Sequence, residues 1–174
     1  MKTEYLLNKE LGHVLAALTP SNALVMKVSL QTGLRVSDVL NLKSAQLKNR
    51  FWVTEGKTGK KRMVGLDTGL IESILSLSGG SVWAFPGRGG SKRPRTRQSV
   101  WKDVKRASTA FRLPQNVGPH SARKIYAVRL MEKYGDLKRV QKALRHSSQS
   151  VTAVYAMADM LLERKRQKRA RKAP

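Results

Sequence analysis

Three short segments of the chain combine side chains that could act on a phosphodiester. Residues 32–38 read Thr-Gly-Leu-Arg-Val-Ser-Asp, residues 120–123 read His-Ser-Ala-Arg, and residues 144–155 contain His146 and Tyr155. Arginine can bind a phosphate through two parallel hydrogen bonds and stays charged at any working pH. Histidine can bind or release a proton near neutral pH, and a tyrosine hydroxyl can act as a nucleophile. These segments therefore hold the candidate functional residues.

Each segment also has a plainer explanation when it is considered alone. In a chain this basic, Arg35 could neutralise a distant phosphate or face solvent. His120 and Arg123 are three residues apart and share a helix face, where they could be a capping histidine and a surface arginine. Tyr155 follows apolar Val151 and Val154, so it could be a core residue whose hydroxyl reaches the rim of the fold. Only the occurrence of all three segments in one chain indicates a catalytic site.

The charge of the chain indicates a polyanionic partner. The sequence has 35 Lys and Arg against 11 Asp and Glu, which gives a formal net charge of +24. Nucleic acid is the first candidate, because basic side chains that neutralise phosphates release condensed counterions. Ribosomal and RNA-chaperone proteins share this composition. An anionic membrane surface fits less well, because the basic residues are spread along the chain and do not line one amphipathic helix.

Length and composition restrict the class of protein further. A chain of 174 residues, of which 40% are hydrophobic, can bury one core. There is no cysteine, which excludes disulfides, thiolate metal sites and cysteine nucleophiles. Charged residues interrupt the N-terminal apolar pattern, and no window has membrane-spanning length. We therefore expect a cytoplasmic protein, with one domain over residues 1–160 and a basic tail over residues 161–174.

The pattern of apolar residues predicts a mainly α fold with a small antiparallel β-sheet (α+β). Helices are expected at about residues 5–18, 21–32, 37–42, 70–77, 98–110, 119–133, 136–144 and 148–159. Ser21 and Asp136 are the expected N-terminal caps of two of these helices, and Gly33 and the pair Gly79-Gly80 are expected C-terminal stops.

One hairpin and one basic loop are also expected. The apolar runs 51–53 and 63–66 flank Gly-Lys-Thr-Gly at 56–59, which is typical of a β-hairpin. Residues 86–97 carry five positive charges and are so rich in Gly and Pro that we expect a loop without regular structure.

The order and spacing of the motifs resemble those of the tyrosine recombinases, also called phage integrases. The resemblance lies in residues 32–38, in Gly-Lys-Thr-Gly-Lys-Lys-Arg at 56–62, in His-x-x-Arg at 120–123, and in His146 followed nine positions later by Tyr155. It extends from about residue 20 to residue 158 and implies the fold of a tyrosine recombinase catalytic domain. It assigns catalytic roles to Arg35, Lys57, His120, Arg123, His146 and Tyr155.

The sequence departs from this family at two points. Many members have Leu-Gly-His where this chain has Leu144, Arg145 and His146, and the larger arginine could change how the histidine is presented. The N-terminal helical domain with which most members clamp DNA is not evident. We therefore expect the chain to be either a minimal member of the family or a fragment.

The resemblance implies a cationic site around one phosphate. A phosphodiester under attack gathers negative charge on its non-bridging oxygens, so cations must converge there. Arg35 and Arg123 would bind the phosphate, and His146 would add a third donor. His120 would bind the phosphate or help to deprotonate the nucleophile, and the division of roles between the histidines stays open. Asp38 is expected to brace Arg35 or a neighbouring backbone turn.

The resemblance also implies a covalent intermediate. Attack by Tyr155 would form a 3′-phosphotyrosine and expel a 5′-hydroxyl, which leaves readily only when it is protonated. Lys57 fits that general-acid role, with Lys60 or Lys61 as alternatives. Since the covalent link conserves the energy of the phosphodiester, no ATP is expected, and no metal or other cofactor is expected either. The sequence lacks a phosphate-binding loop and the clustered carboxylates of a two-metal nuclease.

The expected partner is double-stranded DNA, on which the protein would assemble as a dimer to a tetramer. The residues expected to contact DNA are Lys60, Lys61, Arg62, Arg88, Lys92, Arg93, Arg95, Arg97 and Lys124. The tail could grip DNA or dock on a neighbouring protomer.

The resemblance implies a site-specific recombinase or integrase that cleaves and rejoins strands of duplex DNA. Three other functions remain open at this point. A type IB topoisomerase would form the same covalent adduct. A DNA-binding protein that keeps the scaffold without the activity, or a basic RNA-binding module, would form none.

Overall fold

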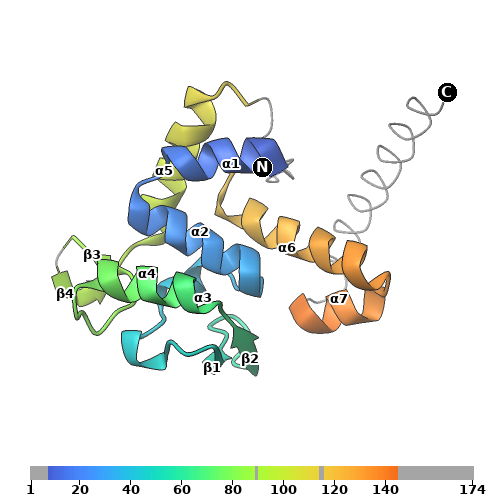
Figure 1. Ribbon diagram of the computed structural model, residues 1–174, viewed down its shortest axis with the longest axis horizontal. Helices are drawn as coiled ribbons and strands as arrows, with labels where there is room; N and C mark the ends of the chain where they lie inside the picture. The colour runs from blue at the N-terminus through green and yellow to red at the C-terminus, as the bar shows by residue number, and fades with distance from the viewer. Residues whose placement is uncertain (1–7, 89, 114–115, 145–174) are drawn as a thin grey trace. The chain divides into compact units, whose positions relative to one another are not determined.

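The computed structural model describes residues 8–88, 90–113 and 116–144 (Figure 1). The helices are α1 (Asn8–Ala17), α2 (Pro20–Thr32), α3 (Val36–Leu40), the 3-10 turn Ser44–Gln46, α4 (Thr68–Ser78), α5 (Arg97–Ala110), α6 (Pro119–Tyr134) and α7 (Leu137–Leu144). The strands are β1 (Arg50–Thr54), β2 (Lys61–Gly65), β3 (Pro86–Gly87) and β4 (Gly90–Pro94). The predicted helix 148–159 and the predicted tail 161–174 lie outside the described residues.

The chain divides after Tyr126, within α6, into two compact units. Almost all described elements belong to the first unit, and the remainder of α6 together with α7 belongs to the second. No helix among the described residues is long and apolar enough to cross a membrane. The mainly helical fold with small antiparallel sheets agrees with the predicted fold class.

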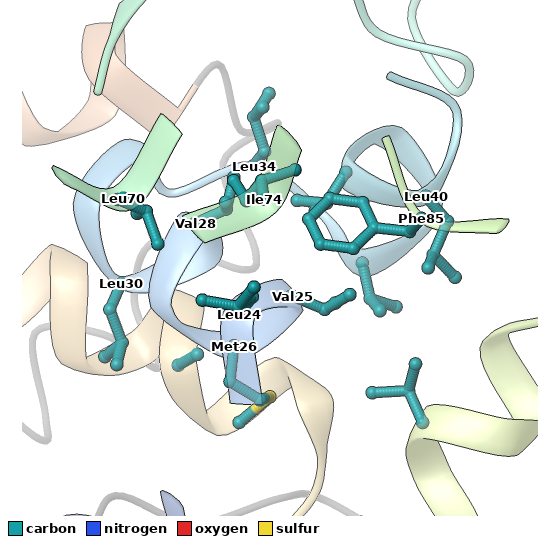
Figure 2. Close-up of a cluster of buried hydrophobic side chains, with 14 of the residues drawn as sticks. Leu24, Val25, Met26, Val28, Leu30, Leu34, Leu40, Leu70, Ile74 and Phe85 are labelled. Atoms are coloured by element: carbon teal, nitrogen blue, oxygen red, sulfur yellow. The ribbon is translucent and has the colours of Figure 1, made fainter. Parts of the chain in front are cut away.

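Helix α2 is the central element of the first unit. It contacts α1, α3, α4, α5 and β2, and in Figure 1 it runs beside α4. Figure 2 shows its side chains Leu24, Val25, Val28 and Leu30 among core residues from its neighbours, including Phe85. Buried positions occur around most of the helix, as expected for a helix enclosed on several sides. Helix α2 is therefore enclosed by the surrounding core.

The N-terminal end of α2 is capped by a residue from α5. Ser21 was predicted as the cap, and this was wrong: the helix begins at Pro20, and Thr19 occupies the cap position without a side-chain cap bond. Proline suits the first helical position because no N–H is needed there. The Asp103 carboxylate instead accepts hydrogen bonds from Thr19 N (2.9 Å), Thr19 Oγ1 (2.9 Å) and Asn22 Nδ2 (2.7 Å). No local pattern could reveal a cap that is 81 or 84 residues away in sequence from the residues it contacts.

The C-terminal end of α2 matches the prediction. Gly33 is left-handed, with φ of 66°, and its N–H donates to the carbonyl of Ser29 at 2.8 Å. A Cβ at Gly33 would collide with the ring of Tyr126. The position therefore requires glycine both for its conformation and for the space that it leaves.

The predicted hairpin is formed by β1 and β2. The strands are antiparallel, with Phe51 opposite Val64 and Trp52 opposite Met63. Burial alternates along both strands, so that Phe51, Val53 and Val64 face the core. The turn that joins the strands carries Lys57.

The prediction that residues 86–97 form a loop was wrong over part of its length. β3 and β4 form a second antiparallel pair with an irregular register at Pro86 and Gly87. A Cβ at Gly87 would lie 3.0 Å from the carbonyl oxygen of Pro94. Gly and Pro are tolerated in short edge strands and at bulges, which explains why composition alone suggested a loop. Helix α5 then begins at Arg97, capped by Thr96.

Two other predicted helix ends are confirmed. Gly79 closes α4 in the left-handed conformation. In the second unit, the Asp136 carboxylate accepts a hydrogen bond from Lys138 N at 2.8 Å, and so caps α7. Both positions were visible in the sequence because their signals are local.

Candidate active site

Two buried arginines are held by the last carbonyl groups of α2. Arg62, from β2, donates through Nη2 to the carbonyl of Thr32, and Arg123, from α6, donates through Nη1 to the carbonyl of Gly33. The last carbonyls of a helix have no partner within the helix and carry partial negative charge, so this end of α2 attracts cations. Arg62 is 7% exposed and Arg123 is 5% exposed.

Arg35 follows the same helix end and joins these two arginines. It occupies the N-cap position of α3, and its Nη1 lies 2.8 Å from Oε2 of Glu55 and 3.9 Å from Oδ2 of Asp38. We call Arg35, Arg62 and Arg123 the arginine cluster. Its three members come from three elements that are far apart in sequence.

Asp38 has the bracing role that was expected of it. Its Oδ2 pairs with Arg35, and its Oδ1 accepts a hydrogen bond from Gly56 N at 3.0 Å. The carboxylate thus contacts both the arginine and a backbone turn, and both parts of the prediction are confirmed.

Glu55 is a member of the site that sequence reasoning missed. It is fully buried; its Oε2 pairs with Arg35, and its Oε1 lies 3.5 Å from Arg62 Nε. A period-2 signal could have found it, because Phe51, Val53 and Glu55 alternate along β1 and its extension. The same alternation along β2 turns Arg62 inward, while Lys60 and Lys61 are exposed. Arg62 was grouped with DNA-contacting residues; the structure places it inside the cluster.

His120 and Arg123 lie in the first turns of α6, on the shared face that their spacing predicted. The pKa of Arg123 is lowered to about 10, mainly by burial and also by the neighbouring Arg35 and Arg62, while Glu55 and Asp38 oppose this effect. Arg123 therefore remains charged at neutral pH.

The pKa of His120 is also lowered. Loss of water around the imidazole is the largest cause, followed by the positive charges of Arg123, Arg97 and Arg35. The residue as a whole is exposed to solvent. At neutral pH His120 is thus mainly an uncharged imidazole beside the arginine cluster.

Lys57 is exposed on the turn of residues 56–59, which we call the Lys57 turn. Both Thr58 N and Gly59 N donate to the carbonyl of Glu55, at 3.2 Å and 2.8 Å. Gly56 N donates to Asp38. The base of the turn is therefore tied to the same carboxylate residues that contact Arg35.

The described part of the site has an excess of positive charge. The arginine cluster contributes three positive charges, and Glu55 and Asp38 contribute two negative charges, before Lys57 is added. An anion such as a phosphate would balance this charge. Among the described residues, no group of three or more His, Asp or Glu side chains could hold a metal ion.

The remaining predicted residues divide into two sets. Arg88, Lys92, Arg93 and Arg97 are exposed along β3, β4 and the start of α5. Arg95 and Lys124 are half-buried, and burial lowers the pKa of Arg95. His146 and Tyr155 lie outside the described residues, so their roles stay predictions.

Comparison with known proteins gives matches over most of the chain. Residues 4–161 match the Phage integrase family. The chain is 31% identical to tyrosine recombinase XerC of Agrobacterium fabrum over 148 residues, which are 79% of this chain and 46% of that protein. It is 34% identical to tyrosine recombinase XerD of Rhizobium meliloti over 134 residues, which are 71% of this chain and 43% of that protein.

A solved structure shares both the fold and part of the sequence. The XerH site-specific recombinase, in a pre-cleavage complex with its difH substrate, matches with a TM-score of 0.67 and 28% identity, covering 89% of this chain and 51% of that one. The chain spans about half the length of the curated relatives that it matches. The family match extends over both the arginine cluster and the predicted nucleophile, and we conclude that this chain belongs to the phage integrase family of tyrosine recombinases.

Proposed function

We propose that this chain cleaves and rejoins strands of duplex DNA at specific sites, through a covalent link between Tyr155 and a 3′-phosphate. The observation that carries the proposal is the gathering of Arg35, Arg123 and His120 at one end of α2, from segments 85 and more residues apart. Such a group of fixed cations beside an uncharged imidazole suits a phosphodiester in which negative charge develops.

The two predicted arginines bind the phosphate from fixed positions. Arg35 has five N–H donors and uses Nη1 for Glu55, so other donors can be directed at a phosphate. Arg123 is anchored on the carbonyl of Gly33 and is charged at neutral pH. Because both guanidinium groups are already oriented, little reorganisation is needed when charge develops on the phosphate oxygens.

The proposed cleavage step moves two protons. The Tyr155 oxygen forms a bond to phosphorus while its proton passes to His120, which is uncharged and can accept it. The bond between phosphorus and the 5′-oxygen breaks, and that oxygen takes a proton from Lys57 on its exposed turn. His146 donates a further hydrogen bond to the phosphate.

Rejoining reverses these steps on a new 5′-hydroxyl. The phosphotyrosine link keeps the energy of the broken phosphodiester, so we propose that neither ATP nor a metal ion takes part. Strand exchange joins two duplexes and needs at least two copies of the site, so we propose assembly of a dimer or tetramer on DNA. The DNA-bound state of the similar XerH recombinase supports the choice of substrate class.

A nicked DNA substrate that traps the covalent intermediate tests this function. We expect a protein–DNA adduct that survives denaturation with the wild-type chain, and none with Tyr155→Phe. If both chains bind DNA and neither forms an adduct, the chain is a binding module on the same scaffold. If the adduct forms but the products are relaxed circles without recombinant joints, the function is that of a topoisomerase.

A further inference from the structure

The side chain of Glu55 connects two parts of the proposed site that come from different segments. Its Oε2 accepts a hydrogen bond from Arg35 Nη1 at 2.8 Å and another from Thr58 Oγ1 at 3.2 Å. Its Oε1 faces Arg62 Nε at 3.5 Å. One carboxylate therefore contacts the phosphate-binding arginine and the Lys57 turn at the same time.

The backbone of Glu55 makes the same connection. Its carbonyl accepts from Thr58 N and Gly59 N, and its own N–H donates to the carbonyl of Lys60 at 3.1 Å. The Lys57 turn closes over Glu55 through these bonds. A shift of Glu55 would consequently move both Arg35 and the base of the turn.

Stability alone does not explain a charged residue at this position. Glu55 continues the inward-facing series of Phe51 and Val53, where an apolar side chain would fit the pattern. A fully buried carboxylate loses its hydration, and a buried ion pair is often no more stable than a well-packed apolar replacement. What the ion pair does provide is a defined direction for the Arg35 guanidinium.

We propose that Glu55 is a positioning residue that fixes the Lys57 turn and Arg35 relative to each other, so that the leaving oxygen can be protonated while the phosphate is held. This inference rests on the proposed function. Glu55 touches neither the phosphate nor the leaving group; it acts through Arg35 and through Thr58.

The charge of Glu55 predicts opposite effects on binding and on rate. Glu55→Gln removes a negative charge from a site for a phosphate, so DNA affinity should be unchanged or higher. The cleavage rate of bound DNA should fall by between about tenfold and about a hundredfold, because small misplacements of catalytic groups have effects of this size. If Glu55 were needed only for folding, Glu55→Gln would reduce DNA affinity and the cleavage rate together.

A substrate with sulfur in place of the bridging 5′-oxygen separates the two contacts of Glu55. A thiolate leaves without protonation, so cleavage of this substrate does not depend on Lys57. Thr58→Val removes the turn contact and leaves the pair with Arg35. We expect Thr58→Val to slow cleavage of normal DNA and to recover fully on the sulfur substrate, and Glu55→Gln to recover only in part, since Arg35 stays misplaced.

The matched control is Glu72→Gln, a change at an exposed carboxylate on α4, which should cleave both substrates like the wild type. The inference is overturned if Glu55→Gln and Thr58→Val also behave like the wild type, or if sulfur raises all rates by the same factor. If Glu55→Gln does not fold, the result for Thr58→Val alone tests the inference, because this residue lies on a surface turn and its substitution should leave the fold intact. If the wild type forms no adduct, it is the proposed function that fails.

Discussion

Replacing Asp103 with asparagine should destabilise the first unit by removing the charge that caps α2. The carboxylate is 9% exposed and accepts hydrogen bonds from Thr19 and Asn22, and from Arg106 Nη2 at 2.7 Å. Burial opposes its ionisation, but these hydrogen bonds prevail and lower the pKa of Asp103 from 3.8 to about 2. Asparagine keeps the shape of the side chain and resembles the protonated acid.

The size of the effect follows from that shift in pKa. A difference of nearly two units corresponds to about 2 kcal/mol of folding free energy at neutral pH. For a chain of this size we expect the melting temperature to fall by about 4–8 °C. The pKa of Asp103 is depressed in the folded state, so its contribution is complete above the unfolded value of 3.8 and is lost as the pH falls towards 2.

Urea unfolding between pH 6 and pH 2.5 would measure both parts of this prediction. Asp103→Asn should be less stable than the wild type at pH 6, and the difference should shrink as the pH falls below 4. The control Asp136→Asn changes an exposed cap of α7 and should cost no more than about 1 kcal/mol. Equal stability of wild type and Asp103→Asn at pH 6, or a constant difference down to pH 2.5, would refute the reasoning.

Two further predictions concern the site itself. Gly33→Ala places a side chain in a left-handed conformation against Tyr126, so the free energy of unfolding should fall by more than the roughly 1–2 kcal/mol of the conformational cost alone, and cleavage should also be slower. The control Gly79→Ala, where a Cβ meets nothing within 4 Å, should lose only that conformational cost. Equal losses of stability for the two variants, measured by chemical denaturation, would argue against the Tyr126 contact. The imidazole of His120 should titrate by NMR with a midpoint below the ordinary 6.5, and Arg97→Gln should raise that midpoint because a neighbouring positive charge is removed; an unchanged midpoint would exclude that charge as a cause.

Features set by neighbouring residues were predictable from the sequence. Gly33 and Gly79 stop helices because only glycine adopts the left-handed conformation freely, and Asp136 caps the helix that follows it. The hairpin around Lys57 was visible in two alternating strands. The expected roles of Arg35 and Arg123 came from their motifs, and the structure brings both to the end of α2.

Features set by distant contacts were not predictable in the same way. Asp103 caps α2 across the core, where no sequence neighbour shows it. Glu55 was missed because a lone acidic residue after a strand resembles any turn residue until its inward direction is considered. The strands β3 and β4 were missed because Gly87 and its neighbours are residue types that are common in turns. In the structure, glycine is needed at position 87 because the backbone of the opposite strand lies so close.

The central claim is that Arg35 and Arg123 hold one scissile phosphate. Single-turnover cleavage and equilibrium DNA binding, measured for Arg35→Ala and Arg123→Ala, test it most directly. We expect the rate to fall by about a hundredfold or more, while affinity falls far less, because many other basic residues are expected to contact the DNA backbone. Equal losses of rate and affinity would reduce both arginines to ordinary DNA contacts and would contradict the account.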